Sequence, residues 1–113
     1  MATMVVGDVK LELDEFGYLV DWQAWSEEAA KALARKEGIL LTAEHWTIIT
    51  LIRNYFEERK DPPIIKILLS DIEKEMGPEK GNLNYVYSLF PQGAGKQAFR
   101  IAGIPRPRGC CIG

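Results

Sequence analysis

Residues 42–60 of the chain read TAEHWTIITLIRNYFEERK. Large side chains recur in this stretch every three or four residues, at Trp46, Ile49, Ile52, Arg53 and Phe56. This spacing places them on one face of an α-helix. Thr42 is a favourable N-cap, and Asp61-Pro62-Pro63 ends the helix at about Lys60. The sequence therefore predicts a long core helix, with Arg53 as a partly buried cation that has a carboxylate partner.

Shorter helices are predicted on both sides of this segment. Ser26 is a good N-cap for a helix that ends near Glu37, where Gly38 closes it. Downstream helices are predicted over roughly 64–76 and 83–90, with one or two further turns over 96–102. The expected core face of the helix at 64–76 consists of Ile64, Ile67, Leu68 and Ile72.

The N-terminus predicts a β-hairpin. Residues 5–6 and 9–13 flank Gly7-Asp8, and Val9, Leu11 and Leu13 alternate with charged residues. The expected fold class is mainly α with a small N-terminal β-hairpin (α+β). We expect one compact helical bundle over residues 1–102, with a flexible arm over residues 103–113 belonging to the same domain.

Charge is divided unevenly along the 113 residues. All 16 acidic residues precede residue 80, whereas the last third carries only the cations Lys80, Lys96, Arg100, Arg106 and Arg108. No apolar run has the length of a membrane span, and the N-terminus lacks the pattern of a secretory signal. We therefore expect a cytoplasmic protein with reduced thiols and no membrane partner.

Both cysteines, Cys110 and Cys111, lie in the terminal stretch GIPRPRGCCIG. Chain ends are seldom ordered, and prolines and glycines separate these thiols from any apolar periodic segment. Arg106 and Arg108 precede Cys110, and nearby cations favour the nucleophilic thiolate. The pattern predicts a mobile arm with a reactive sulfur on Cys110, Cys111 as a possible second thiol, and support from four cations, Arg106, Arg108, Arg100 and Lys96.

Other chemistries fit the sequence less well. A metal site needs about four ligands, and only His45 could join the two thiols, so neither metal nor cofactor is expected. His45 is interpreted as a structural residue at a helix start. A disulfide between adjacent cysteines is strained, although it could form transiently in a redox sensor. A DNA-binding helix-turn-helix over 64–76 and 83–90 is disfavoured because the second helix has no Lys or Arg.

Several long motifs resemble the family of sulfur-relay proteins that includes TusE and DsrC, the gamma subunit of dissimilatory sulfite reductase. The resemblance runs over nearly the whole chain. Its motifs are Asp14-Glu15-Phe16-Gly17-Tyr18-Leu19, Trp25, Thr42-Ala43-Glu44-His45-Trp46, Glu79-Lys80-Gly81-Asn82, Tyr85-Val86-Tyr87-Ser88-Leu89-Phe90-Pro91, Gly95-Lys96-Gln97-Ala98 and Ile101-Ala102-Gly103-Ile104-Pro105-Arg106-Pro107.

The resemblance implies a sulfurtransferase that acts as a protein co-substrate, with Cys110 as the persulfide carrier. It also implies two partners, a sulfur-donor relay complex and an acceptor, either a tRNA thiolase or a sulfite reductase-like protein. Two departures stand out. The family's cysteine is penultimate, whereas Cys111, Ile112 and Gly113 follow Cys110 here. Phe99 stands where sulfite-reductase-linked members carry a second cysteine, which favours the relay branch with one cysteine.

Overall fold

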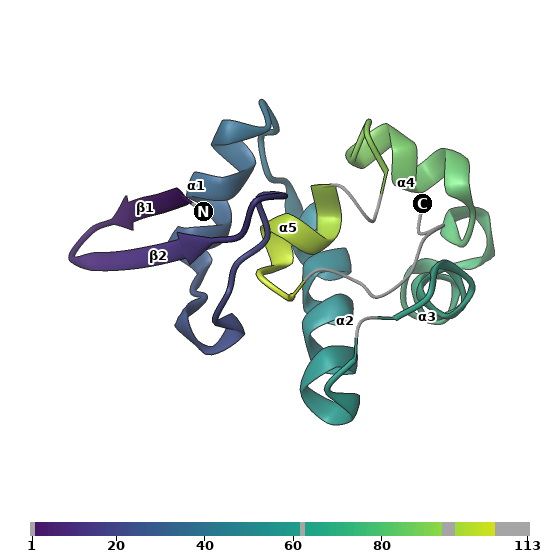
Figure 1. Cartoon of the computed structure of the whole chain (residues 1–113). Coiled ribbons are helices and arrows are strands. Elements are labelled where there is room, and N and C mark those ends of the chain that lie inside the picture. The colour runs from purple at the N-terminus through teal and green to yellow at the C-terminus, as the bar shows by residue number, and fades with distance from the viewer. Residues whose placement is uncertain (1, 62, 94–96, 106–113) are drawn as a thin grey trace.

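The long helix α2 (Ala43–Arg59) stands at the centre of the molecule, as the computed structural model in Figure 1 shows. The structure describes residues 2–61, 63–93 and 97–105. The β-hairpin and α1 (Glu27–Lys36) lie on one side of α2, and α3 (Ile65–Met76) and α4 (Leu83–Leu89) lie on the other. The short helix α5 (Phe99–Ala102) packs against both α1 and α2.

The predicted hairpin and helices are all present. Strand β1 (Ala2–Val6) pairs antiparallel with β2 (Val9–Leu13), and two short 3₁₀ turns, η1 (Trp22–Ala24) and η2 (Pro78–Lys80), precede α1 and α4. Ser26 caps α1, because its hydroxyl accepts a hydrogen bond from the backbone N–H of Ala29 at 3.1 Å. The last residue of α2 is Arg59, and the C-cap residue Lys60 adopts the left-handed conformation with φ of 57°.

Two residues assigned to the core from the sequence are exposed instead. Val9 is 50% exposed because it adjoins the hairpin turn, which projects beyond the rest of the molecule in Figure 1. Ile64 is 53% exposed because it is the extended N-cap of α3 and does not share the helix's apolar face. Ile65 packs against the core in its place.

The core extends to the last residues that the structure describes. Phe99, Ile101, Ala102 and Ile104 are fully buried, so the C-terminal helix and the residues after it are part of the folded body. Packing therefore continues two residues past the boundary expected at residue 102. Along the described ranges, no helix has both the length and the apolar character needed to cross a membrane.

Candidate functional site

The candidate site is the base of the C-terminal segment. Four of the predicted site residues, Cys110, Cys111, Arg106 and Arg108, lie outside the residues that the structure describes, as does Lys96. The structure does describe the chain up to Pro105 and therefore shows how that segment is attached. Arg100 is the only predicted site residue within the described ranges.

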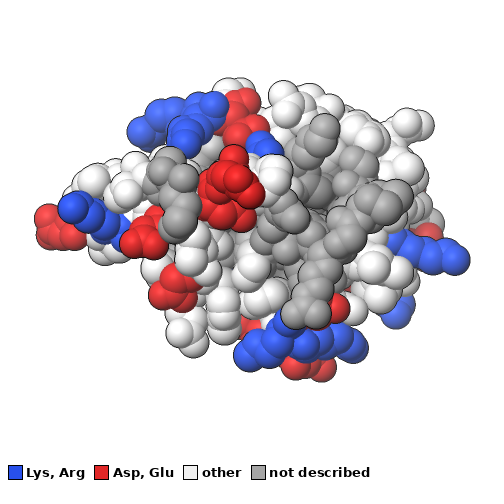
Figure 2. Space-filling model, viewed as in Figure 1, with Lys and Arg blue, Asp and Glu red and all other residues white. Residues whose placement is uncertain are grey.

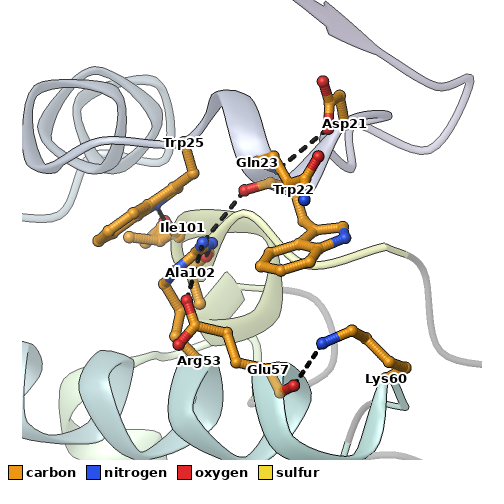
Figure 3. Close-up of polar contacts among 9 residues, drawn as sticks. All are labelled: Asp21, Trp22, Gln23, Trp25, Arg53, Glu57, Lys60, Ile101 and Ala102. Atoms are coloured by element: carbon orange, nitrogen blue, oxygen red, sulfur yellow. Dashed lines mark hydrogen bonds and ion pairs between the residues drawn. The ribbon is translucent and has the colours of Figure 1, made fainter.

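Two side chains from distant parts of the chain hold this base by its backbone, as Figure 3 shows. The indole Nε1–H of Trp25 donates a hydrogen bond to the carbonyl of Ile101 at 2.8 Å. The guanidinium of Arg53 donates to the carbonyl of Ala102 at 2.7 Å and to that of Trp22 at 3.1 Å. The carbonyls of Ile101 and Ala102 are the last of α5 and lack partners inside their own helix.

Arg53 is buried, and the groups around it compensate its charge. Its guanidinium carbon lies 4.1 Å from the ring centroid of Trp25 and 5.7 Å from that of Trp22. The carboxylate of Glu57, one turn along α2, is 3.9 Å from Nη2. Burial lowers the pKa of Arg53, and the Glu57 charge opposes that effect. The predicted partly buried cation with a carboxylate partner is confirmed, and it contacts the C-terminal helix.

Gly103 completes the attachment. It ends α5 in the left-handed conformation with φ of 72°, which only glycine adopts freely. A Cβ atom at this position would lie 2.1 Å from Cδ1 of Trp25. Backbone and indole are therefore in direct contact. We call Trp25, Arg53 and the backbone of residues 101–103 the clamp.

Arg100 belongs to a separate polar cluster between α5 and α1. Its guanidinium is 3.5 Å from the carboxylate of Glu37 at the end of α1 and 5.2 Å from the ring centroid of Tyr18. The amide of Gln97 donates to the same carboxylate at 3.3 Å and accepts from the backbone N–H of Gln92 at 2.8 Å. Arg100 thus ties α5 to α1.

His45 is a structural residue, as its sequence context predicted. Its Nδ1 accepts hydrogen bonds from the N–H and the hydroxyl of Thr42, at 3.1 and 2.8 Å. Its Nε2–H then donates to the carbonyl of Leu89 at 2.9 Å and joins α2 to α4. Both ring nitrogens are used, so the imidazole has no free nitrogen for catalysis.

A second polar contact joins α2 and α4. The hydroxyl of Tyr85 donates a hydrogen bond to the carboxylate of Glu44, and Lys80 lies 3.9 Å from that carboxylate. Burial raises the pKa of Tyr85, and the hydrogen bond to Glu44 raises it further. Sequence reasoning missed this pair and the clamp. The sequence signals for the clamp concerned its members one by one, Arg53 as a partly buried cation and Trp25 within a family motif, and none linked them to α5.

Several known proteins are similar to this chain in sequence and fold. The family model described as DsrC like protein matches residues 5–111. Sulfurtransferase TusE of Pectobacterium atrosepticum is 46% identical over 97 residues, 86% of this chain and 89% of that protein. The Haemophilus influenzae sulfurtransferase TusE homolog is 39% identical over 105 residues, covering 93% and 96%.

Solved structures agree with these matches. The oxidized gamma-subunit of the dissimilatory sulfite reductase (DsrC) from Archaeoglobus fulgidus superposes with a TM-score of 0.88 and 45% identity, covering 97% of this chain and 100% of that one. Fold and sequence together define the class as sulfur-relay proteins with a sulfurtransferase role. The chain belongs to the DsrC-like family.

Proposed function

We propose that the chain carries the transferred sulfur as a persulfide on Cys110. The Cys110 thiolate attacks the outer sulfur of a donor persulfide, the donor S–S bond breaks, and the donor cysteine leaves as a thiolate. An acceptor thiolate then attacks the outer sulfur of Cys110-S-SH, and Cys110 leaves as the thiolate. Each step exchanges one S–S bond for another, so no external oxidant or reductant is required.

The family match carries this proposal, because the matched residues 5–111 include both cysteines. The clamp supports it, since it fixes the base of the cysteine-bearing segment to the core. Arg106 and Arg108 would stabilise the thiolate and the persulfide anion. The arm then begins after Ile104, the last fully buried residue among those described.

The partners that fit this chemistry are a sulfur-donor relay complex and a sulfur acceptor, both proteins in the cytoplasm. Phe99 offers no thiol and is fully buried, so a long-range disulfide from Cys110 to that position cannot form. We infer that the chain relays sulfur between proteins, as in tRNA 2-thiouridine synthesis or sulfur oxidation. It does not serve as the complete co-substrate of a dissimilatory sulfite reductase.

Intact-mass spectrometry tests the carrier residue. Wild type and Cys111→Ala, incubated with a persulfide donor, should each gain about 32 Da, the mass of one sulfur atom on a thiolate. Cys110→Ala should pass no sulfur to an acceptor thiol. Normal transfer by Cys110→Ala, together with loss of transfer by Cys111→Ala, would assign the role to the other cysteine.

The same measurement tests the pathway. The chain is mixed with dissimilatory sulfite reductase, sulfite and an electron donor, and intact masses are recorded. We expect no trisulfide within one chain, because adjacent cysteines close such a bridge only under strain. A trisulfide spanning Cys110 and Cys111 would show that the adjacent pair replaces the missing thiol at Phe99.

A further inference from the structure

An open apolar cavity lies where α1 ends and α2 begins. Its volume is about 430 Å³, and Leu40 at its edge is 86% exposed, more than any other large apolar side chain that the structure describes. A large apolar area that borders solvent often marks an interaction site. The cavity is lined by Lys31, Ala34, Arg35, Gly38, Ile39, Leu40, Leu41 and Trp46.

Two exposed cations stand at the rim of this cavity. Lys31 lies 3.7 Å from Glu28, but both side chains are more than half exposed, and such pairs contribute little. Arg35 has no ion pair with any residue that the structure describes. Figure 2 shows Lys and Arg side chains next to Asp and Glu side chains over the region that α1 occupies in Figure 1. The rim of the cavity therefore carries positive charge, although it lies in the part of the chain, residues 1–79, that holds all 16 acidic residues.

Trp46 relates this cavity to the clamp, because it lines a neighbouring cavity as well. Trp46 also lines a second cavity of about 240 Å³, whose walls include Trp25 and Arg53. On the other side, Glu37 at the end of α1 is ion-paired with Arg100 on α5. A protein seated beside α1 would therefore lie next to the base of the arm. We call the cavity of about 430 Å³ between the end of α1 and the start of α2 the docking groove.

We propose that the docking groove binds the sulfur-exchange partner through a segment that carries a large apolar side chain beside Asp or Glu. This inference rests on the proposed function, because it names the chemistry of the partner that exchanges sulfur with the arm. The apolar side chain enters the cavity against Leu40 and Trp46, and the carboxylate meets Arg35 and Lys31. Apolar burial supplies affinity, and the charges supply orientation and steering.

A phage-displayed library of random linear peptides, selected on the full chain, tests the proposal even though the partner is unidentified. We expect the selected peptides to combine a large apolar residue with a nearby acidic residue. Titration of the isotope-labelled chain with such a peptide should shift the indole N–H signal of Trp46. A selection with no such consensus, or shifts confined to other elements, would overturn the proposal.

Substitutions at the rim test where the peptide binds, and similar substitutions at α3 serve as matched controls. Leu40→Asp and Arg35→Glu should each weaken peptide binding about tenfold or more, through lost apolar contact and charge repulsion. Ile64→Asp and Lys66→Glu, exposed changes of the same kind at the start of α3, should leave binding unchanged. Equal loss in both sets would show that the peptide binds through general charge and not in the groove.

Cys110→Ala separates this proposal from the proposed function. It should bind the peptide as wild type does, because the described residues that line the groove all belong to α1, α2 and the segment between them. If the wild-type chain forms a persulfide but binds no peptide, the docking proposal is refuted and the carrier role of Cys110 stands. If the wild-type chain binds the peptide but never forms a persulfide, the carrier role of Cys110 is refuted and the docking proposal stands.

Discussion

Replacing Gly103 by alanine should destabilise the protein more than a glycine-to-alanine change normally does. Gly103 ends α5 with φ of 72°, and the added Cβ would lie 2.1 Å from Cδ1 and 2.7 Å from Cγ of Trp25. The substitution therefore has two separate costs. One is the left-handed backbone, and the other is the contact with an indole that is itself hydrogen-bonded to Ile101.

The magnitudes follow from these two costs. A left-handed non-glycine residue costs about 1–2 kcal/mol. Forcing an extra carbon into a packed contact costs about 1–3 kcal/mol, because the indole and the backbone must shift. The free energy of unfolding should fall by about 2–5 kcal/mol, the sum of the two. A domain of this size loses about 4 °C in Tm per kcal/mol, so Tm should fall by about 8–20 °C.

Gly38→Ala is the matched control. Gly38 follows α1 with φ of 75°, and a Cβ there would meet nothing within 4 Å. This variant should lose only the backbone contribution of about 1–2 kcal/mol. Urea unfolding followed by Trp fluorescence measures both variants, and the difference between them isolates the contact with Trp25.

A double-mutant cycle gives the decisive result. In a Trp25→Ala background, Gly103→Ala should cost close to what Gly38→Ala costs, because the indole is gone and only the Cβ of residue 25, 3.0 Å from the added carbon, remains. If the two alanine variants lose the same stability in the wild-type background, Trp25 does not restrict the backbone at Gly103. The clamp would then lack its contact between indole and backbone.

Other substitutions test the remaining contacts. Arg53→Met should lower the free energy of unfolding by about 2–4 kcal/mol, since it leaves the buried Ala102 carbonyl without its charged donor, whereas exposed Arg59→Met should cost less than about 0.5 kcal/mol; urea unfolding measures both. Because burial and Glu44 raise the pKa of Tyr85, its hydroxyl should ionise above the ordinary value near 10, and Tyr85→Phe should remove that late step from the tyrosinate absorbance titration. Since the raised pKa reflects a preference for the neutral hydroxyl, this contact should stabilise the fold fully below about pH 10, and its contribution should fall as the pH rises through the folded-state pKa.

Local patterns predicted most of the helix boundaries because the signals are local. Ser26 and Thr42, whose side chains suit the N-cap, begin α1 and α2 as predicted, and α1 ends just before Gly38. The role of His45 was also predictable, because its partner Thr42 is three residues away. Such contacts depend on residues within one helical turn, which the order of amino acids displays directly.

The two misplaced core residues show the limit of periodicity. Val9 fits the alternation of β2, but alternation cannot tell which end of a hairpin projects past the core. Ile64 fits the helical spacing of α3, but the N-cap has an extended backbone and its side chain leaves the helical face. In both cases the position relative to the element's end decided burial, and the pattern of apolar residues did not.

The clamp lay beyond sequence reasoning because its members are far apart in the chain. Trp25 meets Ile101 and Gly103, and Arg53 meets Ala102, across separations of 76 residues for the indole bond and 49 for the guanidinium bond. No local pattern links such positions. The sequence predicted Arg53 to be a partly buried cation and placed Trp25 in a family motif, but it could not show that both would contact α5.

A fixed base and a nearby docking groove have a joint consequence for sulfur transfer. Cys110 follows Ile104 by six residues, and extended chain spans at most about 3.6 Å per residue, so Cys110 lies within about 22 Å of Ile104. If Cys110 carries the sulfur, as proposed, the acceptor sulfur must enter that radius. A partner held in the docking groove lies beside the end of α1, and Glu37 there is ion-paired with Arg100 on α5, next to the base of the arm. Docking in this groove would raise the effective concentration of the two sulfurs, and the clamp would keep that gain from being lost to motion of the arm's base.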